Sequence, residues 1–145
     1  MTSFVRCALC FVIVVGSAGC NDAWTKHFEN VESANREGLL DKGWIPRFIP
    51  PDSKNIVASG DLDSGIVLGS FVSMNYDRVK AKCSKAPDSL SIPSYARRWI
   101  GIRDATDSGT LRSNGYEVLM CSSDNFDLAD LNREHKFLYW TSDRK

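Results

Sequence analysis

The amino-acid sequence predicts an α+β fold in which an antiparallel sheet of about four strands packs against two helices. Two segments carry apolar residues at helical spacing, residues 22–41 and 75–86. Short runs rich in β-branched and aromatic residues recur between residues 64 and 141. The chain has 145 residues, enough for one domain with an ordinary hydrophobic core.

The first helix is expected over residues 22–41. Trp24, Phe28, Val31 and Ala34 follow one another at spacings of four, three and three, which places them on one stripe of a helix. We therefore expect this stripe to face the core.

A strand is expected over residues 64–74, SGIVLGSFVSM, and a second helix from Asn75, its cap, to the residue before Pro87. Three further strands are expected in ARRWIGIR, YEVLMC and KFLYWT, at residues 96–103, 116–121 and 136–141. Turns are expected in DATDSGTLRSNG, where Asn114-Gly115 is typical of a hairpin. The acidic stretch SSDNFDLADLNREH is interpreted as the loop between the last two strands.

The stretch GWIPRFIPP carries three prolines, which exclude the interior of a helix and of a central strand. Trp44, Phe48 and Ile49 are nevertheless strongly apolar. Two interpretations remain open. The segment either lies extended across the domain with Trp44 as its anchor, or it exposes these side chains as a patch that binds a partner.

The first nineteen residues have the layout of an export signal. Arg6 precedes an apolar stretch of about a dozen residues, which is too short to span a bilayer. The residues that follow, Ser17, Ala18, Gly19 and Cys20, resemble the lipobox of bacterial lipoproteins, in which the cysteine receives a diacylglycerol before the signal is cut. We therefore expect a signal peptide at 1–19 and a single lipidated domain at 20–145, with an ordinary secretory signal as the alternative.

Lipid on Cys20 would make the membrane the first partner of the mature domain. Asn21 follows the cysteine where an Asp would be expected for inner-membrane retention, and this resembles the default that sends lipoproteins to the periplasmic face of the outer membrane in a Gram-negative host. The formal net charge of the chain is zero, so we expect no nucleic-acid partner. An envelope protein remains a possible further partner.

Cys83 and Cys121 are the two other cysteines beyond the signal. In an oxidising compartment such an even pair is a disulfide candidate. Two buried free thiols, packing as small hydrophobic side chains, are the alternative.

No catalytic constellation is evident, and we expect neither an enzyme nor a cofactor or metal site. The two histidines, His27 and His135, lie in polar surroundings, and the sequence contains no nucleophile elbow, zinc-binding helix or Gly-rich phosphate loop. Asp61 and Asp63 alternate before a glycine as in a calcium loop, but Val72 stands where such a loop places its closing Glu.

The stretches GLLDKGWIPRFIPPDSKNI and DLDSG, taken in order, resemble a set of small, functionally uncharacterised bacterial lipoproteins. These have a lipobox, a short helix, a Gly-Trp-(Leu/Ile)-Pro segment and an Asp-(Leu/Ile)-Asp before a strand. The matching residues are Gly43, Trp44, Ile45, Pro46, Pro50, Ser53, Ile56, Asp61, Leu62 and Asp63. The terminal FLYW is similar to the closing strand of that group. The resemblance implies lipidation and a shared fold, and it implies no activity.

We therefore expect a noncatalytic envelope lipoprotein that binds a protein partner or a small ligand through the proline-containing segment. The candidate residues there are Trp44, Phe48 and Ile49. The alternative is a membrane-displayed inhibitor or immunity protein that docks on a toxin or lytic enzyme through carboxylates of the acidic stretch. Those candidates are Asp124, Asp127 and Asp130, which otherwise belong to a solvated loop.

Overall fold

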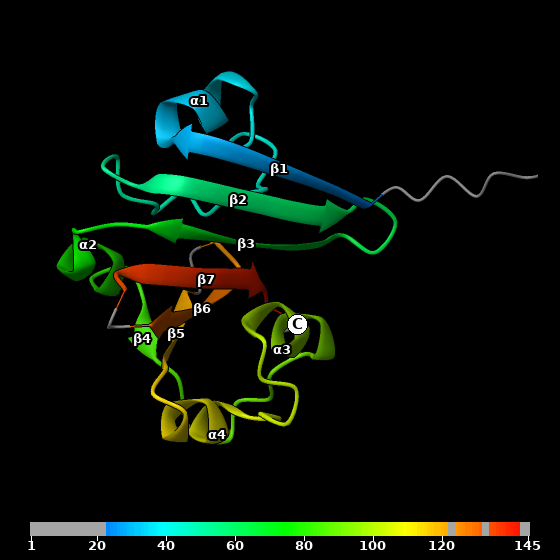
Figure 1. Ribbon diagram of the computed structural model, residues 1–145, viewed down its shortest axis with the longest axis vertical. Helices are drawn as coiled ribbons and strands as arrows, with labels where there is room; N and C mark the ends of the chain where they lie inside the picture. Colours follow the sequence, from blue (N-terminus) through cyan, green and yellow to red (C-terminus); the bar gives the residue numbers. More distant parts are fainter. Residues whose placement is uncertain (1–22, 122–123, 132–133, 143–145) are drawn as a thin grey trace, which may run out of the picture.

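The computed structural model describes residues 23–121, 124–131 and 134–142. Within them, seven strands form one sheet in the order β1-β2-β3-β7-β6-β5-β4, and every pairing is antiparallel (Figure 1). The strands are β1 (Ala23–Asn30), β2 (Lys54–Asp61), β3 (Ile66–Val72), β4 (Ser84–Lys85), β5 (Glu117–Cys121), β6 (Phe126–Leu131) and β7 (Lys136–Thr141). The helices are α1 (Val31–Arg36), α2 (Tyr76–Lys80), α3 (Ser94–Ile100) and α4 (Ser108–Ser113). The expectation of about four strands and two helices is therefore wrong, because the fold is mostly sheet with short helices.

The expected helix over residues 22–41 is wrong in its first half, which is the edge strand β1, and the short helix α1 follows. Strand β1 pairs with β2 along its length, and only Phe28 of its eight residues is buried. Helix α1 starts at a capping box in which the side chain of Asn30 accepts a hydrogen bond from the backbone N–H of Ser33 at 2.9 Å. The helical spacing of the apolar residues was thus coincidental within β1.

The expected strand at residues 96–103 is also wrong, because most of it is helix α3. This helix follows Pro93 and buries Ala96 and Ile100, which lie one turn apart. Its last residue is followed by Gly101 in a left-handed conformation, with φ of 87°, as is common at helix C-termini.

The expected turns at residues 104–115 contain helix α4. The side chain of Asp107 caps it by accepting a hydrogen bond from the backbone N–H of Thr110 at 2.8 Å. The Asn114-Gly115 pair ends this helix and does not form a hairpin. The backbone N–H of Tyr116 donates to the carbonyl of Leu111 at 3.1 Å, which closes the helix end.

The acidic stretch contains an inner strand of the sheet, β6, which lies between β5 and β7. Five of its six residues are buried. The strands expected around residues 64–74, 116–121 and 136–141 are confirmed as β3, β5 and β7, and the second expected helix is present in shortened form as α2.

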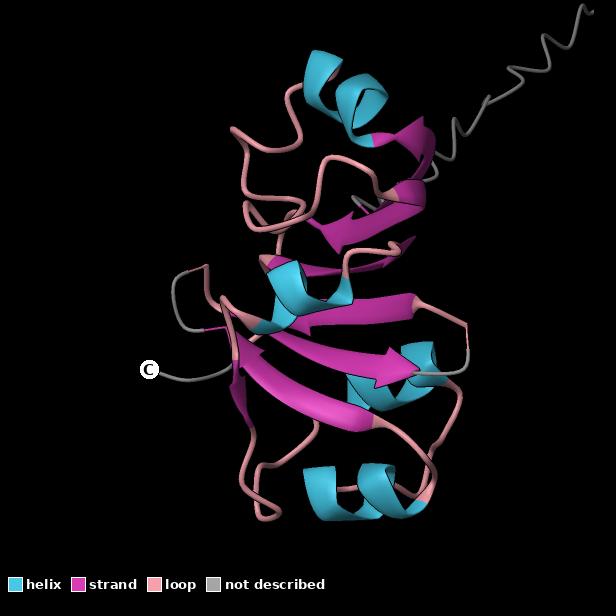
Figure 2. Cartoon of the chain, turned by 90° about the vertical axis from the view of Figure 1, so that its left-hand side faces the viewer, coloured by secondary structure: helices cyan, strands magenta, loops and turns pink. Residues whose placement is uncertain are grey.

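The sheet carries a hydrophobic core on each face. Helices α2 and α3 lie on opposite faces of the sheet (Figure 2). The first core lies under α2 and residues 39–49. It includes Leu39, Ile45, Phe48, Ile56, Phe71, Phe126, Phe137 and Tyr139. The second core lies under α3 and α4. It includes Ile92, Ile100, Leu111, Val118, Ala129, Leu138 and Trp140. Alternate residues of β7 enter opposite cores because successive side chains of a strand point to opposite faces.

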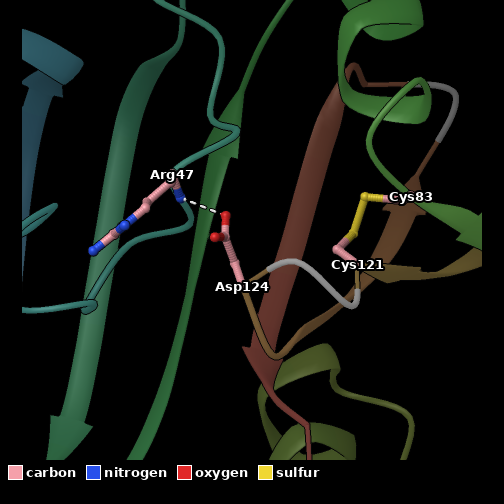
Figure 3. Close-up of a disulfide and its surroundings, with 4 residues drawn as sticks. All are labelled: Arg47, Cys83, Cys121 and Asp124. Carbon is pink, nitrogen blue, oxygen red and sulfur yellow. Dashed lines mark hydrogen bonds between the residues drawn. A yellow bond between two sulfur atoms is a disulfide. The ribbon is translucent and has the colours of Figure 1, made fainter.

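A disulfide joins Cys83, just after α2, to Cys121 at the end of β5, with their Cα atoms 4.3 Å apart (Figure 3). Cys121 is fully buried in the first core. The bond therefore attaches the covering segment of the first core covalently to the sheet. None of the helices in the described part of the chain combines the length and apolar character needed to cross a bilayer.

Candidate functional site

A pocket of about 300 Å³ opens at the end of the sheet where the chain enters β1. Ala23, the first residue of β1, pairs with Asp61, the last of β2, so the chain entry lies beside the β2–β3 turn (Figure 1). We call this hollow the aromatic pocket. It is lined by Trp24, Lys42, Gly43, Trp44, Gly60, Asp61, Leu62, Gly65, Val67 and Thr141.

Two tryptophans form one wall of the aromatic pocket. The ring centroids of Trp24 and Trp44 are 4.3 Å apart, and the ring planes are tilted by 32°. Trp24 lies close against Gly60, where an added Cβ atom would come within 2.7 Å of the indole ring. The absence of a side chain at residue 60 therefore allows Trp24 to lie on β2.

The position of Trp44 is fixed from the first core. Its backbone carbonyl accepts a hydrogen bond from the hydroxyl of Tyr139 at 3.2 Å, and its backbone N–H donates to the carbonyl of Leu39 at 2.9 Å. Half-buried Trp44 packs against the edge of this core. The proline-containing segment therefore holds one indole at the pocket.

A cation and an apolar tip complete the aromatic pocket. The ammonium group of Lys42 lies 4.7 Å from the centroid of the Trp44 ring, within cation–π distance. Leu62, in the β2–β3 turn, is 59% exposed. The carboxylate of Asp61 holds this turn by accepting a hydrogen bond from the backbone N–H of Asp63 at 2.9 Å. The pocket can thus make apolar, stacking and cationic contacts.

The other candidates of the proline-containing segment lie in the first core. Phe48 is 9% exposed and Ile49 is 6% exposed, and both belong to the buried cluster. The interpretation of these two side chains as an exposed patch is corrected, because their apolar surface is already covered. Trp44 alone of the three keeps a partly accessible ring.

The acidic stretch does not present three carboxylates to solvent. Asp127 and Asp130 lie in β6 and are buried, so the structure contradicts their placement on a docking surface. Asp124 is half-buried, and its carboxylate accepts a hydrogen bond from the backbone N–H of Arg47 at 2.9 Å (Figure 3). Asp124 therefore fixes the proline-containing segment to the loop before β6.

Asp130 belongs to a polar cluster between α2 and the sheet. Lys80 forms an ion pair with Glu117, and the hydroxyl of Tyr76 donates to the same carboxylate at 3.0 Å. The hydrogen bond from Lys80 lowers the pKa of Glu117, whereas burial raises the pKa of Asp130 and that of Tyr76.

Shifted pKa values of this kind can indicate an active site, but ion-pair networks with a structural role produce the same shifts. Asp130 has no exposed surface through which a substrate could reach it. In the part of the chain that the structure describes, no group of three or more His, Cys, Asp or Glu side chains is placed to hold a metal ion. The ion pair and hydrogen bond of the cluster join α2 to β5.

Cys20 and the predicted signal at 1–19 lie outside the described residues. The described residue nearest to Cys20 is Ala23, three positions later. The paired cysteines, Cys83 and Cys121, form the disulfide of the first core and take no part in the aromatic pocket.

Sequence reasoning missed most of the aromatic pocket. Trp24 and Trp44 are twenty positions apart, and Trp24 was placed in the stripe of a helix. The one available signal was Leu62, an apolar residue between two aspartates in a turn, which is a position where an apolar side chain has little to pack against.

Residues 22–72 match the family model described as the YbbD head domain. The match covers about a third of the chain, including β1, β2 and β3, and contains every residue of the aromatic pocket except Thr141. Among curated proteins and among solved structures, nothing matches the chain. The match supports a relationship to a small bacterial family and points to an envelope-related protein. It identifies no specific partner. In its first three strands, the chain is therefore similar to a YbbD head domain.

Proposed function

We propose that this protein is a noncatalytic envelope lipoprotein, tethered by lipid on Cys20, whose contact surface is the aromatic pocket. The observation that carries the proposal is the place where the chain enters the domain. Ala23 lies at the end of the sheet that bears the pocket, and only two residues separate it from Cys20. The lipid attachment and the binding groups would thus share one end of the molecule.

A lipid on Cys20 would give a stable tether. Each buried methylene group contributes about 0.8 kcal/mol, so two or three acyl chains anchor a protein where a single chain is marginal. The lipobox-like residues Ser17, Ala18 and Gly19 support the attachment. The small residues before the cysteine also support removal of residues 1–19 by a signal peptidase.

The chemistry of the pocket supports binding and not catalysis. Its lining offers indole faces, one lysine and an exposed leucine, together with the side chains of Asp61 and Thr141. The Asp61 carboxylate is engaged by the backbone of the β2–β3 turn, and the other groups recognise a ligand without activating a nucleophile. The titratable cluster around Asp130 lies apart from this pocket, because none of its four members is among the lining residues.

The test is the intact mass of the protein purified from membranes. We expect wild type to have the mass of residues 20–145 plus acyl chains, and Cys20→Ser to lose both the acyl mass and the membrane association. Cys10→Ser, within the predicted signal, is the matched control and should keep both. An unacylated wild type would overturn the proposal.

The final membrane depends on the residue after the lipidated cysteine. Asn21 supports placement on the periplasmic face of the outer membrane in a Gram-negative host. We expect wild type in the outer-membrane fraction of a density gradient and Asn21→Asp in the inner-membrane fraction. Equal distribution of the two proteins would contradict this placement.

A further inference from the structure

We infer that the aromatic pocket end of the sheet lies in the interfacial layer of the bilayer that holds the Cys20 lipid. In this orientation Trp24, Trp44 and Leu62 contact phospholipid, not a protein partner. The inference rests on the proposed tether, and it adds to it an orientation of the domain and the chemical identity of what the pocket contacts.

The length of the tether is the first argument. Ala23 is three positions after Cys20, and an extended chain covers at most about 3.5 Å per residue. The Cα atom of Ala23 is therefore held within roughly 10 Å of the Cα atom of Cys20, whose thioether would carry the glyceryl group. Such a short connection cannot carry this end of the sheet far from the headgroups, so a soluble protein would have little room to reach the pocket.

The chemistry of the side chains is the second argument. Tryptophan is enriched at membrane interfaces. The indole N–H of Trp24 is buried, so Trp24 would contact lipid through its ring carbons. Lys42 lies over the Trp44 ring, so its aliphatic stem can follow apolar surface while its ammonium group stays among the headgroups. Leu62 adds an exposed apolar tip beside the two indoles.

Two exposed apolar residues, Leu62 and Met74, distinguish the two ends of β3. Among the described residues, only Leu62 and Met74 are large hydrophobic side chains with high exposure, at 59% and 74%. Leu62 precedes β3 and Met74 follows it, so they lie at opposite ends of that strand. Only the Leu62 end also carries the tryptophan pair, which selects it as the membrane-facing end.

The charges of the turn set the depth of the contact. Asp61 and Asp63 flank Leu62, and carboxylates are costly inside the hydrocarbon region. The turn would therefore enter no deeper than the headgroup and upper acyl region. With Lys42 as the nearby cation, the surface has no strong preference for anionic lipid, and phosphatidylcholine vesicles are a sufficient probe.

The experiment is tryptophan quenching by phosphatidylcholine that is brominated on its acyl chains. Full acylated protein is reconstituted in brominated and in plain vesicles. The chain has four tryptophans, of which Trp140 is fully buried. We expect clear quenching of wild type and loss of most of it in Trp24→Phe/Trp44→Phe. Leu62→Asp should lower the quenching at least twofold, whereas Met74→Asp, the matched control, should leave it unchanged.

Two results would overturn the inference. Quenching that persists fully in Trp24→Phe/Trp44→Phe would assign the contact to another face of the domain. The second result is equal tryptophan emission from wild type in brominated and in plain vesicles, with acylation verified by intact mass. It would show that the domain does not contact the bilayer although the proposed lipid tether is present. Because Leu62 and Met74 are exposed residues outside helices and strands, their variants test the orientation even if the double tryptophan variant fails to fold.

Discussion

The two cores of the sheet differ in how they are covered. The first core is closed by an irregular, proline-containing segment and by the region after α2, which the Cys83–Cys121 disulfide attaches to β5. The second core is closed by two short helices, α3 and α4. The irregular segment has internal turn hydrogen bonds, such as that from the backbone N–H of Ile49 to the carbonyl of Pro46 at 3.1 Å, and further hydrogen bonds join it to the rest of the domain. The hydrogen bonds from Arg47 to Asp124 and from Tyr139 to Trp44 are of this kind.

The comparison also explains where the candidate site lies. The cover of the first core ends at the aromatic pocket, where Trp44 is packed on one side and accessible on the other. Helix α3 is instead joined to the sheet by Trp99, whose indole N–H donates to the carbonyl of Gly69 at 3.0 Å. Trp99 is also half-buried, so the aromatic pocket arises from the packing of Trp44 against Trp24 at this edge of the sheet.

The largest effect is expected from removal of the disulfide. Its cysteines are 38 positions apart, and a loop of this size predicts a loss of about 2–4 kcal/mol in the free energy of unfolding. We expect Cys83→Ala/Cys121→Ala to show this loss in urea denaturation, and wild type to lose a similar amount on reduction. A change below about 0.5 kcal/mol would show that the cover of the first core is held by packing alone.

The next effect concerns the contact between Trp24 and Gly60. Gly60→Ala places a methyl group against the indole ring, so Trp24 must move or β2 must shift. We expect a loss of about 2 kcal/mol in unfolding free energy and a change in tryptophan emission. In Gly65→Ala, which has open space around the added atom and a φ of 67°, we expect backbone strain without the change in emission. An unchanged emission spectrum in Gly60→Ala would contradict the packing described for the pocket.

A smaller pair of effects tests whether the two cores are independent. Phe137 and Trp140 belong to β7 and are fully buried in opposite cores. We expect Phe137→Leu and Trp140→Phe each to lower the unfolding free energy by about 1–2 kcal/mol, and the double variant to show the sum within about 0.5 kcal/mol. A coupling above about 1 kcal/mol would mean that the sheet transmits changes between its faces.

The smallest effect concerns the buried carboxyl of Asp130. Burial raises its pKa above the ordinary value, so the folded protein holds this proton more tightly than the unfolded chain does. Binding of this proton contributes its full stabilisation at pH values below the pKa of Asp130 in the unfolded chain. The contribution is lost as pH rises through the pKa of Asp130 in the folded protein. The side chain of Asp130→Asn is neutral at every pH. We therefore expect the unfolding free energy of this variant at pH 7 to be up to about 1 kcal/mol higher than that of wild type. The difference should vanish in acid.

Glu117 provides the matched control for Asp130 because its pKa is shifted in the opposite direction. The hydrogen bond from Lys80 lowers the pKa of Glu117, so its contribution to stability is present above the unfolded pKa and is lost as pH falls. Glu117→Gln should therefore be less stable than wild type at pH 7. Parallel pH profiles for the two variants, measured by thermal unfolding, would contradict the assigned pKa directions.

Part of the fold was predictable from sequence because some strands carry strong apolar runs. The runs in β3, β5 and β7 identify those strands. Strand β6 alternates Phe126, Leu128 and Asp130 with Asp127 and Ala129, which is the period of a strand, but its aspartates are typical of a loop. Tertiary burial overrode this local preference, because β6 lies between two other strands.

Other elements give little local signal. Strand β1 lies at the edge of the sheet. Its alternate residues Trp24, Phe28 and Asn30 are buried or half-buried, but the exposed Lys26 interrupts the apolar alternation. Helices α3 and α4 have seven and six residues, too few for a reliable helical pattern. The aromatic pocket was unpredictable for a different reason. It depends on the close approach of Trp24 and Trp44. This approach results from the pairing of β1 with β2 and from the path of residues 37–53.

The contact between Trp24 and Gly60 has an evolutionary consequence. An indole that lies directly on the backbone of the neighbouring strand tolerates no side chain beneath it, so neither position can change freely while the other stays as it is. We expect homologues with tryptophan at position 24 to have glycine at position 60. Lineages that replaced the tryptophan by a small residue should have regained a side chain at position 60. We therefore expect residues 24 and 60 to change together. Homologues that lack both the tryptophan and the glycine should lack the aromatic pocket.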